Sequence, residues 1–157
     1  MVNFELTTIA TFYFFQNRPL NTKTDLVIYA KKILYADDDL DDKTWISEAT
    51  EMLNYHLDID FVENGRQVFE YLENQLEEMP ALIVLDLNMP ELDGRQTLKK
   101  LKLNNKYKNI PVVIVTTSAN KVDVEICNRL GASQYLVKPD SHAEWQLIIK
   151  QFMPYIS

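Results

Sequence analysis

The sequence predicts an α/β protein built on a doubly wound, five-stranded parallel β-sheet with five helices. From residue 32 onward, short apolar runs alternate with longer segments in which apolar residues recur every three or four positions. The short runs are typical of strands buried on both faces, and the longer segments are typical of amphipathic helices. Such an alternation favours a parallel sheet covered by helices on both sides. With 157 residues, the chain is long enough to bury a core without disulfides.

The predicted strands are the apolar runs at residues 32–36, 59–62, 82–86, 112–116 and 134–137. An Asn64-Gly65 turn follows the second run, and Pro111 introduces the fourth. Right-handed crossovers between parallel strands leave few topologies for such an order.

The predicted helices cover residues 43–56, 66–77, 94–103, 121–130 and 141–152. Asp93 is a suitable N-cap for the third helix, and Gly131 is a usual stop residue for the fourth. The first and last helices each carry apolar residues on one face, and the apolar stripe of the last helix is expected to be buried. The apolar residues are Trp45, Ile46, Ala49, Met52 and Leu53 in the first helix, and Trp145, Ile148, Ile149 and Phe152 in the last. A dimer or partner face remains an alternative for Trp145 and Tyr155.

Four of the strands end on, or just before, residues that can handle a cation or a phosphoryl group. Asp37, Asp38 and Asp39 follow the first strand, and Asp86 ends the third. The fourth strand ends on Thr116-Thr117, and the fifth is followed by Lys138-Pro139. Because the carboxyl ends of parallel strands meet at one edge of the sheet, where open α/β folds bind ligands, we expect these side chains to converge.

Clustered carboxylates repel one another, and a divalent cation relieves that repulsion. Mg²⁺ suits carboxylate and carbonyl oxygens. Asp37 or Asp38, together with Asp86, is expected to supply ligands, and the backbone carbonyl of Asn88 is a further candidate. The sequence therefore predicts a magnesium site at this edge of the sheet.

Asp86 is the best candidate for a phosphoryl nucleophile, because a carboxylate can form an acyl phosphate. Lys138 offers a positive charge on a flexible stem, and Thr116 offers a hydroxyl donor for phosphoryl oxygens. A cis Lys138–Pro139 bond is also expected.

Each of these residues also has an ordinary explanation. The acidic run from Asp37 to Asp42 resembles a solvated loop that caps the first helix. Taken singly, Asp86 fits a turn, Thr116 fits a strand end and Lys138 fits the surface. The functional interpretation depends on the combination of acid, acid, hydroxyl and amine at four strand ends.

Composition excludes several classes of protein. A net charge of −7 and a pI near 4.8 argue against a nucleic-acid-binding face, which would need to be basic. No apolar stretch approaches the roughly 20 residues of a membrane span. Cys127 is the single cysteine, so a reducing, cytoplasmic setting is expected. His56 and His142 have no metal-ligand partner at a useful spacing and are expected at the surface or at helix ends.

Residues 1–31 fit none of these patterns, and we treat them as an N-terminal extension of unknown role before a domain over residues 32–157. They contain an aromatic run, Phe12-Tyr13-Phe14-Phe15, but lack the basic opening of a secretory signal. The extension is interpreted as an added element, a flexible tail or sequence upstream of the true start, and the last two are favoured.

With these residues described, the sequence resembles a response-regulator receiver domain, the phosphorylated partner of a sensor histidine kinase. The resemblance covers residues 32 to about 155, and it is strongest at 33–39, 82–90 with Asp93-Gly94, 111–116 and 131–139. It implies a flavodoxin-like strand order of 2-1-3-4-5. The end of the chain soon after the last helix is similar to stand-alone, chemotaxis-regulator-like receivers, including those paired with phytochrome-type kinases.

The resemblance also implies a role for each matching residue. These roles are an acidic metal-binding pair at Asp37 and Asp38, a carbonyl ligand at Asn88, a phosphoacceptor at Asp86, a switching hydroxyl at Thr116, a lysine at Lys138 and a mobile aromatic at Tyr135. The kinase would phosphorylate Asp86, and the surface of the fourth helix, fifth strand and fifth helix would then bind a downstream protein or a histidine phosphotransfer protein. The chain is expected to be a monomer or weak homodimer, and not a turnover enzyme.

Two other classes of function remain open. One is an interaction module that never receives phosphate. The other is a metal-dependent phosphatase with Asp86 as nucleophile, although Asn88 stands where such chemistry usually places a second acid.

Overall fold

The computed structural model describes residues 31–53, 55, 57–75 and 78–156. Its strands are β1 (Lys32–Ala36), β2 (Asp58–Val62), β3 (Leu82–Leu85), β4 (Val112–Thr116) and β5 (Gln134–Val137). Its helices are α3 (Leu40–Met52), α4 (Gly65–Asn74), α5 (Gly94–Leu103), α6 (Lys121–Leu130) and α7 (His142–Ile156). Apart from Lys31, the predicted N-terminal extension lies outside the described residues, as does His56.

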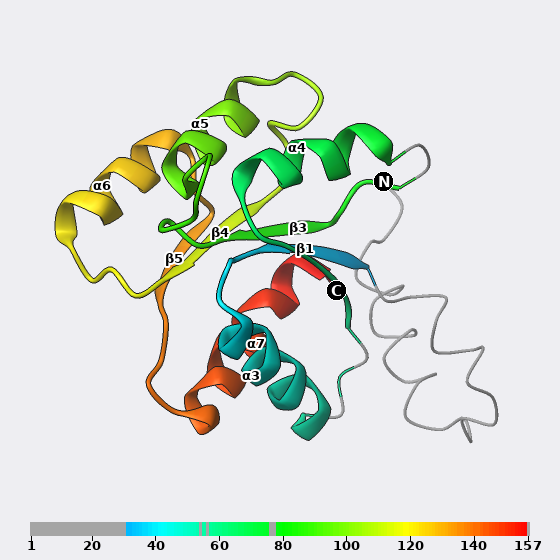
Figure 1. Ribbon diagram of the computed structural model, residues 1–157, viewed down its shortest axis with the longest axis vertical. Helices are drawn as coiled ribbons and strands as arrows, with labels where there is room; N and C mark the ends of the chain where they lie inside the picture. The colour runs from blue at the N-terminus through cyan, green and yellow to red at the C-terminus, as the bar shows by residue number, and fades with distance from the viewer. Residues whose placement is uncertain (1–30, 54, 56, 76–77, 157) are drawn as a thin grey trace, which may run out of the picture.

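The strands form one parallel sheet in the order β2-β1-β3-β4-β5, which confirms the predicted fold class. Figure 1 shows α4, α5 and α6 on one face of the sheet, with α3 and α7 on the other. Within the described part of the chain, no helix combines the length and the apolar character needed to cross a bilayer.

The core consists of two clusters, one on each face of the sheet. Because successive strand residues point to opposite faces, β1 sends Leu34 toward α4, α5 and α6, and sends Ile33 and Tyr35 toward α3 and α7. The four apolar residues predicted on the buried face of the last helix all lie in the second cluster, and Trp145, Ile149 and Phe152 have no exposed surface. Trp145 is therefore a core residue and not part of a partner face.

Three helices differ from their predicted bounds by more than one residue. Helix α3 covers 40–52 and not 43–56, α4 ends at 74 and not 77, and α7 ends at 156 and not 152. Helix α3 begins at Leu40, because the Asp39 carboxylate accepts a hydrogen bond from the Asp41 backbone N–H at 2.9 Å and caps the helix there. Helix α7 continues to Ile156, which is buried against the second cluster. Met52, the last residue of α3, is 61% exposed, although it was predicted to share a face with Ile46 and Ala49, which are buried.

Candidate functional site

The polar residues at the strand ends are held by the sheet's own hydrogen-bond ladder. The backbone N–H of Asp37 donates to the Val62 carbonyl at 2.9 Å, and that of Asp86 donates to the Ala36 carbonyl at 2.9 Å. The Lys138 N–H likewise donates to the Thr116 carbonyl at 2.8 Å. Each side chain therefore leaves the carboxyl edge of the sheet from a backbone position that strand pairing determines.

Three carboxylates converge at this edge. One oxygen from each of Asp37, Asp38 and Asp86 lies within 4.8 Å of the others. Asp37 and Asp86 are buried, whereas Asp38 is exposed. The Oδ1 atom of Asp86 is buried and has no hydrogen-bond partner among the described residues. A buried carboxylate oxygen without a partner is costly, and oxygen donors suit a hard divalent cation, so this group of residues fits such an ion.

An open hollow of about 610 Å³ gives access to the carboxylates. It is lined by Asp38, Asp39, Leu40, Asp41, Asp86, Asn88, Thr117 and Lys138. Asn88 is exposed at the start of the loop that follows β3, which places it beside Asp86 in this hollow.

The loop after Asp86 packs tightly against it. The N–H of Gly94 donates to the Leu87 carbonyl at 3.1 Å. A Cβ atom on Gly94 would lie 2.0 Å from the backbone carbonyl oxygen of Asp86, a separation that real atoms cannot adopt. Glycine at this position therefore allows α5 to start directly against the residue that carries the central carboxylate.

Lys138 follows the edge strand β5 and contacts two of these carboxylates. Its Nζ lies 2.7 Å from Asp37 Oδ2 and 3.3 Å from Asp86 Oδ2, and its side chain is only 7% exposed. Burial disfavours the charged amine, but the contacts with Asp37 and Asp42 outweigh it and raise the pKa of Lys138 above its usual value. The ammonium is therefore permanently charged at neutral pH.

The expectation of a cis Lys138–Pro139 bond is wrong, because the structure has no cis peptide bond among the described residues. The trans form of an X–Pro bond is preferred by about 0.5–1 kcal/mol in the absence of other constraints.

Asp42 belongs to the site, although the sequence analysis treated it only as part of an acidic run. It lies in the first turn of α3, is 6% exposed, and its Oδ2 is 2.5 Å from Lys138 Nζ. A signal for this was present, since Asp42 precedes the buried Ile46 and Ala49 at helical spacing and so shares their inward face.

The electrostatics of Asp37 reflect its surroundings. Burial raises its pKa from the usual 3.8 to about 6, and the neighbouring Asp86 carboxylate adds to the rise. Lys138 and the Asp39 N–H, which donates to Asp37 Oδ1 at 2.9 Å, oppose it. Asp37 is thus a carboxylate whose charge is costly even beside the Lys138 ammonium.

Thr116 and Tyr135 are linked through the loop that leaves β4. Thr116 has no exposed surface, and its hydroxyl accepts a hydrogen bond from the Ser118 N–H at 3.5 Å. The Tyr135 hydroxyl donates to the Ser118 carbonyl at 2.9 Å. Both residues therefore contact the segment that leaves β4.

A polar network that the sequence analysis missed ties this segment to two helices. The Ser118 hydroxyl donates to Asp123 Oδ2 at 2.6 Å, and the Arg95 guanidinium binds Asp123 Oδ1 at 2.7 and 3.0 Å. Since Arg95 and Asp123 are 28 positions apart, no local pattern indicates their pairing.

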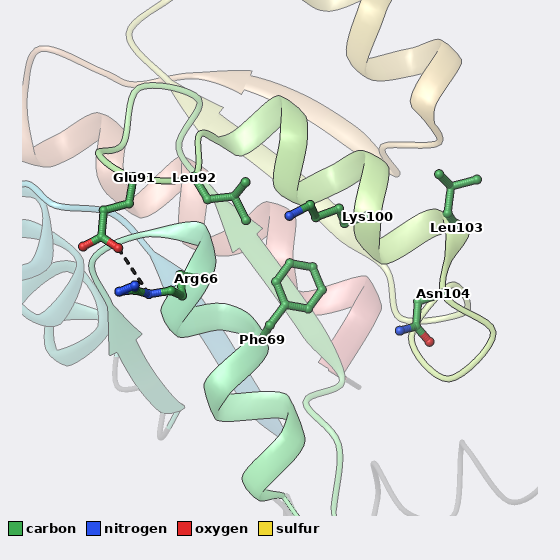
Figure 2. A pocket seen from close by; sticks show the side chains of 7 residues that line it. All are labelled: Arg66, Phe69, Glu91, Leu92, Lys100, Leu103 and Asn104. Carbon is green, nitrogen blue, oxygen red and sulfur yellow. Dashed lines mark ion pairs between the residues drawn. The ribbon is translucent and has the colours of Figure 1, made fainter.

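A second hollow, of about 850 Å³, lies between α4 and α5. Figure 2 shows Arg66 and Glu91 paired at one end of it, with Leu103 and Asn104 at the other. Among the residues that line it, Glu91 is the only carboxylate, so this hollow has no convergent acids for a metal ion or phosphoryl transfer.

Comparison with known proteins identifies the family. Residues 33–150 match the model of the response regulator receiver domain. The chain is 35% identical over 112 residues to the response regulator Rcp1 of Synechocystis, covering 69% of this chain and 76% of the relative.

Solved structures agree with the sequence match. A crystal structure of the phosphorylated cyanobacterial phytochrome response regulator RcpA superposes with a TM-score of 0.72 at 30% identity, over 81% of this chain and 94% of the other. The Mn²⁺-bound form of Rcp1 superposes with a TM-score of 0.69 at 30% identity, over 78% and 91%. From the fold, the family match and these structures together, this chain belongs to the response-regulator receiver family of two-component signalling.

Proposed function

We propose that Asp86 accepts a phosphoryl group from the phosphohistidine of a sensor histidine kinase. The observation that carries this proposal is the position of the Lys138 ammonium, 3.3 Å from Asp86 Oδ2 within a group of converging carboxylates. An Asp86 oxygen attacks the phosphorus, the phosphorus–nitrogen bond to the kinase histidine breaks, and the histidine nitrogen retains the electron pair. The product is an acyl phosphate on Asp86.

Asp37, Asp38 and Asp86 would hold the metal ion, with the backbone carbonyl of Asn88 as a further ligand. We propose Mg²⁺, because the donors are all oxygen atoms. A divalent cation at this position supplies positive charge that offsets the charge on the transferred group. The related Rcp1 has been crystallised with Mn²⁺, which supports a divalent-metal site in this family.

Lys138 and Thr116 would then contact the new phosphoryl oxygens. The Lys138 ammonium is already beside Asp86, and Thr116, which carries the hydroxyl, is the last residue of the adjacent strand β4. Movement of Thr116 toward the phosphoryl group would alter the Ser118 segment and release the hydrogen bond between Ser118 and Tyr135. Tyr135 would turn inward, and the surface of α6, β5 and α7 would change as a two-state switch.

The changed surface is proposed to bind a downstream protein, or the phosphoryl group is passed to a histidine phosphotransfer protein. Either role fits a cytoplasmic protein that is a monomer or weak homodimer. It acts by switching and self-dephosphorylation and not by turnover of an external substrate.

The test is to incubate the protein with acetyl phosphate and Mg²⁺ and to measure its intact mass and the modified peptide. A gain of one phosphoryl group at Asp86 is expected, and Asp86→Asn should show none. Asp140→Asn is the matched control, because Asp140 is an exposed carboxylate outside the cluster. A gain that persists in Asp86→Asn, or no gain in the wild-type protein, contradicts the proposal.

The same preparation separates the two other functions. Steady release of phosphate from an unrelated phosphoester would indicate a phosphatase. An amide NMR spectrum unchanged by beryllofluoride and Mg²⁺ would indicate an interaction module that does not respond to phosphate.

A further inference from the structure

Two cations must share the same buried carboxylates if the proposed function is correct. The Lys138 ammonium contacts Asp37 Oδ2 at 2.7 Å and Asp86 Oδ2 at 3.3 Å. Asp37 and Asp86 are also two of the three residues whose oxygens converge as a metal site. A divalent cation there would repel the ammonium and compete with it for these oxygens.

Asp42 is a carboxylate that contacts the lysine without belonging to the group of converging metal ligands. Its Oδ2 lies 2.5 Å from Lys138 Nζ, the shortest of the three ion pairs that the lysine makes within the described part of the chain. The side chains of Asp42 and Lys138 are 8% and 7% exposed. The cluster of oxygens within 4.8 Å comprises Asp37, Asp38 and Asp86, and Asp42 is outside it.

A role in helix capping does not explain this arrangement. Asp41 is in the same first turn of α3, where a negative charge stabilises the helix, and it is exposed. Burying a second carboxylate in that turn is costly unless it is paired. The pairing with Lys138 is the contact that offsets the cost.

We propose that Asp42 is a positioning residue for Lys138: it holds the ammonium next to the metal-binding carboxylates, so that Lys138 and a divalent cation occupy the site together. The proposal rests on the proposed function, because that function requires both the cation and the lysine at Asp86. In the absence of Asp42, the ammonium moves fully onto Asp37 and Asp86, where it competes with the cation.

The test measures Mg²⁺ binding by isothermal titration calorimetry in four full-length proteins. These are the wild type, Asp42→Asn, Lys138→Met and the double variant. Asp42→Asn is expected to weaken Mg²⁺ binding about tenfold, as is usual for a residue that orients the immediate surroundings of a metal site. Lys138→Met is expected to bind Mg²⁺ at least as tightly as the wild type, and the double variant is expected to match Lys138→Met.

Glu51→Gln is the matched control, because it removes the same charge from the same helix at an exposed position that does not line the hollow around the carboxylates. It is expected to change the Mg²⁺ affinity by less than about twofold, as an exposed charge should. Equal tenfold losses in Glu51→Gln and Asp42→Asn would overturn the proposal, since the effect would then be general electrostatics.

The double variant keeps the test decisive even if Asp42→Asn does not fold, because it removes both members of the buried pair. A loss of affinity in the double variant relative to Lys138→Met would mean that Asp42 acts on the cation directly, and the proposal would be wrong. Unchanged affinity in a folded Asp42→Asn would also refute it. These results do not depend on phosphorylation, so a protein that fails to react with acetyl phosphate but shows the expected binding pattern contradicts only the proposed function.

Discussion

Replacement of Asp37 by Asn should make the metal-free protein more stable at neutral pH. Burial and the adjacent Asp86 raise the pKa of Asp37 to about 6, compared with 3.8 for an ordinary aspartate. This difference corresponds to about 3 kcal/mol of unfolding free energy that the charged carboxylate costs above that pH. Asn is uncharged and retains an oxygen that can accept the hydrogen bond from the Asp39 N–H.

The stability difference between Asp37→Asn and the wild type should depend on pH. Between pH 3.8 and about 6 the folded protein binds more protons at Asp37 than the unfolded chain does, so this residue lowers stability as the pH rises through that window. The advantage of Asp37→Asn over the wild type should therefore be close to its maximum at about pH 7.5 and small at about pH 4.

Urea unfolding in EDTA, followed by circular dichroism at several pH values, measures this difference. Added Mg²⁺ should narrow it, because the wild type gains stability from a cation that the variant binds poorly. The reasoning is refuted if Asp37→Asn is no more stable than the wild type at neutral pH, or if its gain is the same at every pH.

Two further predictions concern the surroundings of the site. Gly94→Ala should destabilise the fold by about 1–3 kcal/mol and weaken Mg²⁺ binding, because its Cβ would displace the Asp86 backbone. Urea unfolding measures the stability, and calorimetry measures the binding. The control is Gln96→Ala, at an exposed position of α5. Wild-type values for Gly94→Ala would show that the loop relaxes without moving Asp86. Arg95→Gln should lower the urea midpoint modestly, because Arg95 pairs with a partly exposed Asp123. The decrease should be smaller at high salt, which screens such a pair. An unchanged midpoint at low salt would show that the pair contributes nothing to the stability of the fold.

Much of the fold was predictable because its signals are local. Strand runs and helical stripes depend on the period of apolar residues, and these periods placed every described element within a few residues of its observed position. The errors arose at helix ends. The side chain of Asp39 started α3 early, and burial of Ile156 extended α7 beyond its predicted end.

The residues at the strand ends could be proposed from the sequence, because parallel strands bring their carboxyl ends to one edge. Helical spacing places Asp42 on the inward face of α3 and Asp41 on the outward face. The same reasoning could not identify Lys138 as the partner of Asp42, because that contact depends on how α3 packs against the residues that follow β5.

The order of strands and helices, the parallel sheet and the chemical character of its carboxyl edge were determined by the sequence alone. The three ion pairs of Lys138, the close approach of Gly94 to Asp86 and the link between Arg95 and Asp123 were decided only by the tertiary structure. The physical reason is that periodicity reports which face of an element is buried. Distances of 2.5 to 3.3 Å between groups far apart in the chain depend instead on how the elements pack together.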